Sequence, residues 1–352
     1  MQKLSRLSVL VKPSSSACNL GCSYCFYIAE SAKRKIKDYG KMELDTWQCV
    51  MNYIFSATTD HAQISICFQG GEPTLIGIDF YRRALKLLDT YRGNRRIFYA
   101  MQTNGTLLND LWINLFKEYH FLLGISIDGI PSIHDENRFD ASKVGSYQRA
   151  IRGYHLAKKA DLDINVLTVV TDPLVQNVDA FIQWLIDEEI EYVQCIPCID
   201  EDHRLTPQYF ASFIKRLFHA KKIGLHTRIG NIEEIMQFLL EGTSAKCGIA
   251  GLCAMQSVIE ADGSIFPCDF YAIDQYCLGN VHRHSFEDII NHPSLEKFLA
   301  DKDVPNMCKS CRYWSFCNGY CKFERQACIS DNYCSHAELL EFVLKTGTFM
   351  EV

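Results

Sequence analysis

The 352-residue chain has no long apolar run and no dense block of basic residues. Its first segment, MQKLSRLSVLVKP, holds only a few consecutive apolar residues, too few for a signal peptide or a membrane span. With 36 basic and 42 acidic residues the net charge is −6, and scattered charge of this kind does not indicate a nucleic-acid surface. Internal repeats and low-complexity tracts are also lacking. We therefore expect a cytoplasmic protein with partners that include neither membranes nor nucleic acids, and a core built from its 48% of apolar residues.

Cysteine, in contrast, is abundant, with 17 residues. A reducing cytoplasm disfavours a disulfide framework, so we expect many of these thiols to bind metal and others to be buried as small hydrophobic residues. They also cluster, because three lie within residues 18–25 and ten within residues 247–334.

Short β-branched runs alternate with amphipathic stretches from residue 7 to about residue 200, and a last amphipathic stretch follows. The predicted strands are 7–12, 64–70, 96–103, 122–128, 164–170 and 192–197, and the predicted helices are 44–57, 79–91, 110–119, 146–160, 178–189 and 207–222. Such alternation is typical of βα units around a parallel sheet. Six units favour a barrel-like wall, although periodicity alone does not separate an open barrel from a doubly wound sheet. In both folds, ligands bind at the carboxyl ends of the strands.

The composition and periodicity of the sequence change after about residue 240. A region rich in glycine and cysteine begins there, with little helical periodicity until SFEDIINH and the closing HAELLEFVLKT. We expect the fold of this region to depend on metal.

The segment CNLGCSYCFY follows the first predicted strand and spaces Cys18, Cys22 and Cys25 as Cys-x3-Cys-x2-Cys. Three thiolates on a four-iron cluster leave one iron without a protein ligand, and an exogenous chelating group can bind there. The alternatives are a zinc site completed by a remote residue and three buried core cysteines.

This loop resembles the hallmark of the radical SAM superfamily. The resemblance implies an α/β fold with a partial (β/α)6 barrel. It also implies that the amino and carboxylate groups of S-adenosylmethionine (SAM) chelate the open iron, and that reductive cleavage of SAM gives a 5′-deoxyadenosyl radical.

Three further motifs end predicted strands in the order that this family has them: GGEP at 70–73, QTNGT at 102–106 and SIDG at 126–129. In the family, a segment like GGEP holds the methionine amino group. Its glycines allow close backbone approach, and either Glu72 or nearby carbonyls can accept from the ammonium. The other two supply hydroxyls and amides for a ribose and a carboxylate. Each motif could instead be an ordinary turn.

Single residues extend the predicted site. Arg138 and Arg152 carry guanidinium groups that suit the SAM carboxylate or a substrate backbone, although each could be a surface arginine. Aromatic and polar side chains at strand ends are candidates for the cavity lining. We predict cofactor binding by Tyr24, Gly70, Gly71, Glu72, Ser126, Arg138 and Ile196, and substrate binding by Tyr27, Gln69 and Arg152.

The later cysteines have the spacing of a ligand set. Cys247-x5-Cys253-x14-Cys268 is followed by Cys308-x2-Cys311-x5-Cys317-x3-Cys321, and then by Cys328 and Cys334. Seven regularly spaced cysteines and one distal cysteine can build two fully ligated four-iron clusters. Two zinc ribbons are the alternative.

This pattern is similar to the SPASM extension of radical SAM enzymes, and most similar to the anaerobic sulfatase-maturating enzymes. The likeness runs from VKPSSSACNLGCSYCFY through FQGGEPTL and MQTNGT to DGSIFPCDFY and NYCSH, nearly the whole chain. It implies a radical SAM barrel over 1–235, a SPASM auxiliary-cluster domain with a C-terminal helix over 236–352, and three [4Fe-4S] clusters. The implied auxiliary ligands are Cys247, Cys253, Cys268 and Cys321 for one cluster, and Cys308, Cys311, Cys317 and Cys334 for the other.

Seven cysteines need separate comment. Cys328 is the alternative to Cys334 as the distal ligand, although the NYC context favours Cys334. The cysteines outside the implied ligand sets lie mostly in apolar runs and are predicted to be small buried residues: Cys49, Cys67, Cys195, Cys198, Cys277 and Cys328.

Asp269 directly follows Cys268 in PCDFY. A carboxylate beside an anionic thiolate cluster should have a raised proton affinity, which suits a general base; the alternative is a turn-capping aspartate. The resemblance implies that an aspartate here accepts the proton released when the adenosyl radical oxidises a peptide cysteine or serine to Cα-formylglycine. It also implies a peptide or unfolded protein substrate and an external one-electron donor such as a flavodoxin or ferredoxin.

Two other functions remain open. A SPASM enzyme that crosslinks or otherwise modifies a ribosomal precursor peptide would share the clusters. Some such enzymes have an N-terminal domain for the leader peptide. Because the first predicted strand starts at about residue 7, we expect no such domain here and favour a maturase that recognises a short motif, although a separate partner could bind a leader. An iron–sulfur electron carrier or zinc scaffold without catalysis would leave the three-cysteine loop and Asp269 unexplained.

Overall fold

The computed structural model describes residues 2–200, 205–242, 246–300 and 303–346. The chain forms two compact units, each assembled from three stretches of sequence. The first unit consists of Met1–Ser126, Phe139–Ile164 and Ala254–Asp301, and the second of Ile127–Arg138, Asn165–Cys253 and Lys302–Val352. The predicted boundary at 235/236 falls within helix α10 (Gly230–Glu241), and the division into domains by residue number stays a prediction.

The first unit contains a sheet in which chain neighbours lie side by side. Strands β1 (Leu4–Val11), β2 (Thr58–Phe68), β3 (Arg96–Thr103) and β4 (Phe121–Ser126) pair in that order, all parallel. Such sequential order is that of a β/α barrel wall, whereas a doubly wound sheet reverses its order at a switch point. On its other side β1 pairs with β8 (Val258–Ile259), which continues antiparallel into β9 (Ser264–Phe266) and β10 (Gly279–Asn280).

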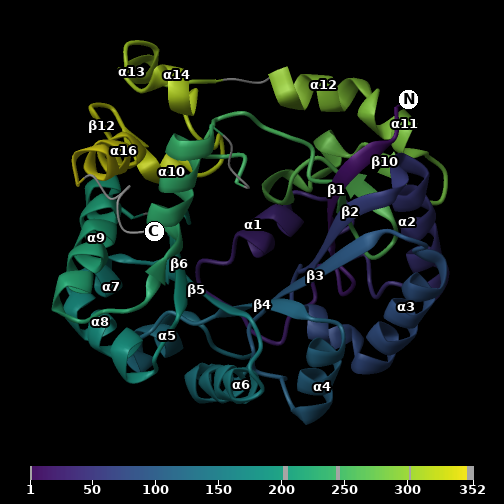
Figure 1. Ribbon diagram of the computed structural model, residues 1–352, viewed down its shortest axis with the longest axis horizontal. Coiled ribbons are helices and arrows are strands. Elements are labelled where there is room, and N and C mark those ends of the chain that lie inside the picture. The colour runs from purple at the N-terminus through teal and green to yellow at the C-terminus, as the bar shows by residue number, and fades with distance from the viewer. Residues whose placement is uncertain (1, 201–204, 243–245, 301–302, 347–352) are drawn as a thin grey trace. The chain divides into compact units, whose positions relative to one another are not determined.

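Helices cover one face of these strands, and α1 lies on the opposite side (Figure 1). The helices of this unit are α1 (Phe26–Ala32), α2 (Leu44–Ala57), α3 (Ile78–Tyr91), α4 (Asp110–Glu118), α6 (Tyr147–Lys159), α11 (Phe286–Ile290) and α12 (Pro293–Ala300), with 3-10 turns η1 (Pro73–Ile76), η3 (Asp269–Tyr271) and η4 (Asp274–Tyr276). The core between helices and sheet is aromatic: Trp47, Phe68 and Tyr81 are fully buried, and the Phe68 ring lies 5.1 Å from that of Tyr81.

Alternation along β1 and β2 decides which side chains reach the other face. Ile64, Ile66 and Phe68 are buried on one face of β2, so Cys67 and, beyond the strand, Gln69 belong to the opposite face. In the same way the burial of Val11 on β1 assigns Lys12 to that opposite face. The backbone N–H of Gln69 donates to Val11 O at 3.0 Å, so Lys12 and Gln69 follow neighbouring strand ends.

The second unit continues the same architecture. Its strands are β5 (Ile164–Val170), β6 (Tyr192–Pro197), β7 (Arg228–Ile229), β11 (Ile329–Ser330) and β12 (Tyr333–Cys334), and β5, β6 and β7 pair in parallel. Its helices are α5 (Pro131–Asn137), α7 (Asp172–Gln176), α8 (Val178–Asp187), α9 (Pro207–Ala220), η2 (Lys221–Ile223), α10, α13 (Asn306–Lys309), α14 (Trp314–Cys317), α15 (Arg325–Cys328) and α16 (Ser335–Thr346). Helix α16 packs against α9 and α10.

The predicted alternation of strands and helices is confirmed. All six predicted strands and all six predicted helices up to residue 222 are present, and the largest difference is that β2 starts at Thr58 and ends at Phe68. Strands β8, β9 and β10 were not predicted, because two or three residues are too few to show an alternating pattern.

Candidate active site

The three-cysteine loop lies between β1 and α1, and Cys25 caps the N-terminus of α1. The Cys18 thiol accepts hydrogen bonds from the Leu20 backbone at 3.4 Å and from Asn104 Nδ2 at 3.8 Å. Burial, and then the nearby charges of Glu72, Cys22 and Cys25, raise the pKa of Cys18 to about 12. The three thiols therefore share one space, and iron binding deprotonates a coordinating thiol. This donor set fits an iron–sulfur cluster.

The GGEP turn packs against the chain that leads into this loop. A Cβ on Gly71 would lie 2.1 Å from the Ala17 carbonyl oxygen, and Gly70 has φ = +125°, which side chains rarely adopt. The Gly71 N–H donates to Ser15 O at 2.8 Å. Only glycine allows this approach, which fits the prediction that backbone comes close to a ligand here.

Glu72 is fully buried and joins the GGEP turn to the end of β3. Its carboxylate accepts from Thr74 Oγ1 at 2.6 Å, Thr103 Oγ1 at 2.8 Å and the Asn104 backbone at 2.8 Å. Burial raises its pKa, and these hydrogen bonds oppose the rise. Protein donors thus reach both carboxylate oxygens of Glu72, and the acceptor of the SAM ammonium stays a prediction.

Two asparagines that were not predicted as site residues connect these segments. Asn104 Nδ2 donates to Asn19 Oδ1, and Asn19 Nδ2 donates to Thr106 Oγ1, both at 2.9 Å. Both residues lie in motifs noted above, CNLGC and QTNGT. Because Asn is common in turns, the motifs did not indicate that these two side chains connect separate segments.

Asp269 comes together with two of the predicted substrate residues. It is the first residue of η3 and is 9% exposed. Tyr27 Oη donates to Asp269 Oδ1, and Gln69 Nε2 donates to Asp269 Oδ2. The Lys12 ammonium lies 2.9 Å from Asp269 Oδ1. All three partners present N–H or O–H groups to the carboxylate of Asp269.

Lys12 is the main residue of this charged group that the sequence did not single out. It is fully buried, lies 4.1 Å from the centroid of the Tyr27 ring, and pairs with Glu260 at 3.5 Å and Glu30 at 4.0 Å. Burial alone would lower the pKa of Lys12, but the carboxylates of Asp269, Glu260 and Glu30 raise it above the ordinary value. The available signal was a lysine that ends the apolar run LSVLVK and faces away from the helices.

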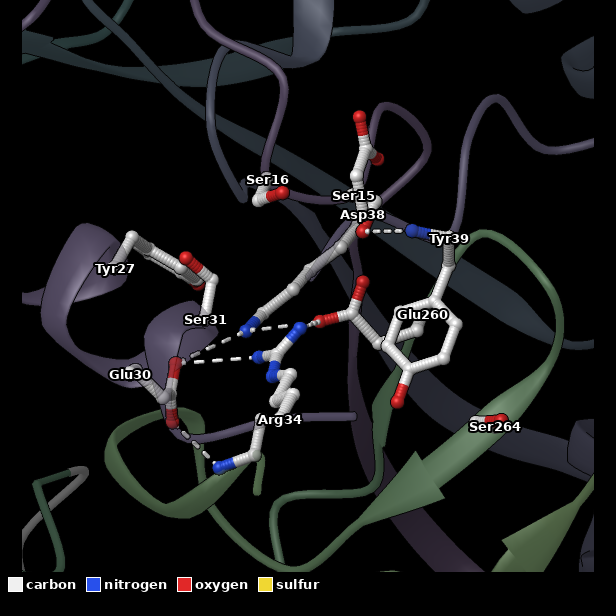
Figure 2. A network of polar contacts seen from close by, with 12 residues as sticks. Ser15, Ser16, Tyr27, Glu30, Ser31, Arg34, Asp38, Tyr39, Glu260 and Ser264 are labelled. Carbon is white, nitrogen blue, oxygen red and sulfur yellow. Dashed lines mark hydrogen bonds and ion pairs between the residues drawn. The ribbon is translucent and has the colours of Figure 1, made fainter. Parts of the chain in front are cut away.

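A second cation, Arg34, pairs with two of these carboxylates, Glu30 and Glu260 (Figure 2). Arg34 Nη1 donates to Glu260 Oε1 at 2.8 Å and Arg34 Nη2 to Glu30 Oε2 at 3.3 Å; Glu30 and Arg34 extend from the α1 segment and Glu260 from the β8–β9 hairpin. Glu30 Oε1 also accepts from the Ala272 N–H at 2.6 Å. Burial raises the pKa of Glu30 to about 7, although Lys12 and Arg34 oppose the rise.

The remaining predicted residues are placed as follows. Arg138, in the second unit, makes a buried ion pair with Asp128 through Nε at 2.8 Å and Nη2 at 3.1 Å, so its guanidinium is engaged by protein. Ser126 ends β4 and Ile196 lies in β6. Tyr24 is 7% exposed, and Arg152 is exposed on α6. The ligand contacts predicted for these residues stay predictions.

The structure groups several of the later cysteines. Burial raises the pKa of Cys334 to about 11, and the nearby thiols Cys317 and Cys308 add to the rise while backbone N–H donors oppose it. The pKa of Cys308 is raised by burial and by the neighbouring thiols Cys317 and Cys311. Cys308, Cys311, Cys317 and Cys334 therefore lie near one another, and their role as four ligands of one cluster stays a prediction.

The other predicted set is partly grouped. Burial, Glu324 and Cys247 raise the pKa of Cys321 to about 11, and a Cβ on Gly248 would lie 2.8 Å from Cys321 Cβ. Cys253 ends its stretch of the second unit, and Cys268 belongs to the first unit.

The cysteines outside the predicted ligand sets divide into two kinds. Cys195, Cys198 and Cys328 are each 1% exposed, as predicted for small buried residues, whereas the prediction is only partly right for the half-buried Cys49, Cys67 and Cys277. All 17 cysteines are free thiols. No three His, Cys, Asp or Glu side chains in the described ranges are arranged to hold a single metal ion. In the same ranges, no helix is long and apolar enough to cross a membrane.

Two ranges of this chain match known protein families. Residues 13–185 match the radical SAM superfamily, and residues 252–312 match the SPASM iron–sulfur cluster-binding domain. A cysteine-type anaerobic sulfatase-maturating enzyme of Clostridium novyi is 34% identical over 91% of this chain and 89% of its own length. This chain belongs to the anaerobic sulfatase-maturating enzymes. It is therefore a radical SAM enzyme with a SPASM domain, which confirms the predicted fold and the predicted cofactors, SAM and [4Fe-4S] clusters.

Another known enzyme and a solved structure are similar to this chain over most of their length. A serine-type enzyme of Klebsiella aerogenes is 28% identical over 93% of this chain and 82% of its own length. The solved structure of anSMEcpe with bound AdoMet and Kp18Cys peptide has a TM-score of 0.86 and 29% identity, and the match covers 97% of both chains.

Proposed function

We propose that this enzyme oxidises a cysteine of a sulfatase or sulfatase-like peptide to Cα-formylglycine. The Clostridium relatives that share 32 to 34% identity are cysteine-type, whereas the serine-type relatives share 26 to 28%. The observation that carries the proposal is the position of Asp269, whose carboxylate is held by Tyr27, Gln69 and Lys12 in the same unit as the three-cysteine loop.

The chain's own residues provide a proton acceptor and its orientation. When bound, SAM and the N-terminal cluster supply the radical that removes a hydrogen atom from the substrate Cβ. Asp269 accepts the thiol proton at a carboxylate oxygen, and Tyr27 and Gln69 fix the plane of that carboxylate. The second electron of this two-electron oxidation would pass to the auxiliary clusters, and water would then replace the sulfur, which leaves as hydrogen sulfide, to give the aldehyde. The side chain of Asp269 is 12% exposed while that of Lys12 is 0% exposed, which supports Asp269 as the group of this cluster that meets a substrate.

Cys18, Cys22 and Cys25 hold the SAM-binding cluster in this proposal. The auxiliary clusters use Cys247, Cys253, Cys268 and Cys321, and Cys308, Cys311, Cys317 and Cys334. The grouping of Cys308, Cys311, Cys317 and Cys334 supports the second set. An external one-electron donor such as a flavodoxin or ferredoxin supplies the electron, and 17 cysteines that form no disulfide suit the reducing cytoplasm.

The deciding experiment is mass spectrometry of a Cys-x-Pro-x-Arg peptide after anaerobic incubation with reconstituted enzyme, SAM and a reductant. We expect 5′-deoxyadenosine and an aldehyde at the cysteine, and less product from a serine version of the same peptide. Asp269→Asn should still cleave SAM, but aldehyde formation should fall roughly a hundredfold or more, the usual contribution of a general base. Undiminished turnover by this variant would remove Asp269 as the proton acceptor.

Modification of a ribosomal precursor peptide is the competing function. Streptococcus suis SuiB bound to its precursor peptide SuiA matches with a TM-score of 0.62 at 16% identity, a similarity that establishes the shared fold alone. An intact Cys-x-Pro-x-Arg peptide in a reaction that still yields 5′-deoxyadenosine would favour this alternative.

A further inference from the structure

Five ionisable side chains form one buried cluster in the first unit. Three are carboxylates, Asp269, Glu260 and Glu30, and two are cations, Lys12 and Arg34. Their exposed fractions are 9%, 0%, 5%, 0% and 4%, in that order. Buried charges persist only when they are paired, so the members of this cluster depend on one another.

Lys12 occupies the centre of the cluster. Its ammonium lies within 4.0 Å of all three carboxylates, and nearest to Asp269, at 2.9 Å. The Lys12 N–H donates to Ile259 O at 2.8 Å, which fixes the backbone at the junction of β1 and β8. The aromatic face of Tyr27 covers the ammonium at 4.1 Å, so the side chain has little freedom to leave Asp269.

The outer pair joins two segments that carry the reacting groups. Helix α1 continues from the three-cysteine loop, and the β8–β9 hairpin continues to Cys268 and Asp269. Arg34 bridges Glu30 on α1 and Glu260 on the hairpin, as Figure 2 shows. Glu30 also binds the backbone N–H of Ala272, directly after η3. The cluster therefore ties the turn that bears Asp269 to the helix that bears Tyr27.

We propose that Lys12 is a positioning residue that orients the Asp269 carboxylate for the substrate, and that Glu30, Arg34 and Glu260 form the buried clamp that holds Lys12 in place. This inference rests on the proposed function of Asp269. Lys12 is sealed from solvent, so it acts through Asp269 and does not contact the substrate. Its raised pKa, caused by the surrounding carboxylates against the effect of burial, keeps it cationic throughout the working pH range.

The test separates SAM cleavage from peptide oxidation. With reconstituted Lys12→Met and the Cys-x-Pro-x-Arg peptide, we expect 5′-deoxyadenosine formation close to wild type and a KM for the peptide within about twofold. The aldehyde formed per 5′-deoxyadenosine should fall roughly tenfold to a hundredfold, the effect of a misplaced catalytic group. Lys12→Arg should restore part of this ratio because it keeps the cation.

Arg95→Met is the matched control. Arg95 is 8% exposed in the same unit and pairs with Asp60 at 3.1 Å, so its loss also removes a buried cation, but one that the structure pairs outside the five-residue cluster. We expect its product ratio to equal that of wild type. Glu260→Gln, which keeps the side-chain shape, should lower the ratio less than Lys12→Met does.

Three results would overturn the inference: an unchanged ratio in Lys12→Met, no gain with Lys12→Arg, or a parallel loss of 5′-deoxyadenosine, aldehyde and iron, which would show a structural role only. Failure of the proposed function itself looks different, because wild-type enzyme would then release 5′-deoxyadenosine without any aldehyde.

Discussion

Glu30 is 5% exposed and shares its surroundings with two cations and two other carboxylates. The cluster therefore has one more acid than base, and burial raises the pKa of Glu30 from 4.5 to about 7. Between these two values the folded protein holds a proton that the unfolded chain has released. Stability that depends on Glu30 is consequently greatest at low pH and is lost as the pH rises through about 7.

This dependence gives a prediction for Glu30→Gln. From pH 6 to pH 8, ionisation of Glu30 should lower the free energy of unfolding of the wild type by about 1 kcal/mol, and the variant should lack this part of the slope. Denaturant midpoints of anaerobically reconstituted protein at the two pH values measure it. The exposed Glu296→Gln on α12 is the control, and equal slopes in wild type and Glu30→Gln would contradict the assignment.

At the scale of elements, the site depends on close packing between two loops. Gly71 touches the chain before Cys18, and a Cβ there would lie 2.1 Å from a backbone oxygen that has no flexible end to move. Gly21 lies inside the three-cysteine loop itself, yet a Cβ there would meet only Phe139 Cε2, at an ordinary 3.7 Å. The two glycines therefore form a matched pair for testing how the loop is held.

Gly71→Ala should displace the three-cysteine loop and cost roughly 1–3 kcal/mol of stability, whereas Gly21→Ala should be tolerated. We expect Gly71→Ala to lose SAM cleavage and close to four of its irons after reconstitution, because one [4Fe-4S] cluster depends on this loop. Iron analysis and 5′-deoxyadenosine assays measure both effects. Full iron content and SAM cleavage in Gly71→Ala would mean that the loop accommodates the methyl group.

At the scale of the whole molecule, local sequence patterns predicted the strands and helices but not which distant residues contact one another. The strands and helices up to residue 222 follow from apolar period, and the cysteine loop follows from its spacing. The contacts of Lys12 could not be predicted in this way, since Glu30 and Glu260 are 230 positions apart in the chain and meet only through the pairing of β1 with β8. The protein donors that bind the Glu72 carboxylate could not be predicted either, because Thr103 and Asn104 come from the end of another strand.

The choice between Cys328 and Cys334 belongs to this scale, because the eighth auxiliary ligand comes from far along the chain. Cys328 is 1% exposed in an apolar cluster with Phe238, Ile249 and Tyr320. Cys334 is half-buried, and it lies close enough to Cys317 and Cys308 for their charges to raise its pKa. Cys334→Ala should therefore reduce the iron content from about twelve to about eight per chain, since one four-iron cluster loses a ligand.

Cys328→Ala should keep about twelve irons and lose only a little stability, because alanine fills most of the volume of a small buried residue in an apolar cluster. Electron paramagnetic resonance of the reduced proteins would show which cluster signal disappears with Cys334→Ala. The reverse result, iron loss with Cys328→Ala and full iron with Cys334→Ala, would move the ligand to Cys328. In that case the thiol now packed against Tyr320 would have to leave the apolar cluster to reach the iron, and α15 would have to shift with it.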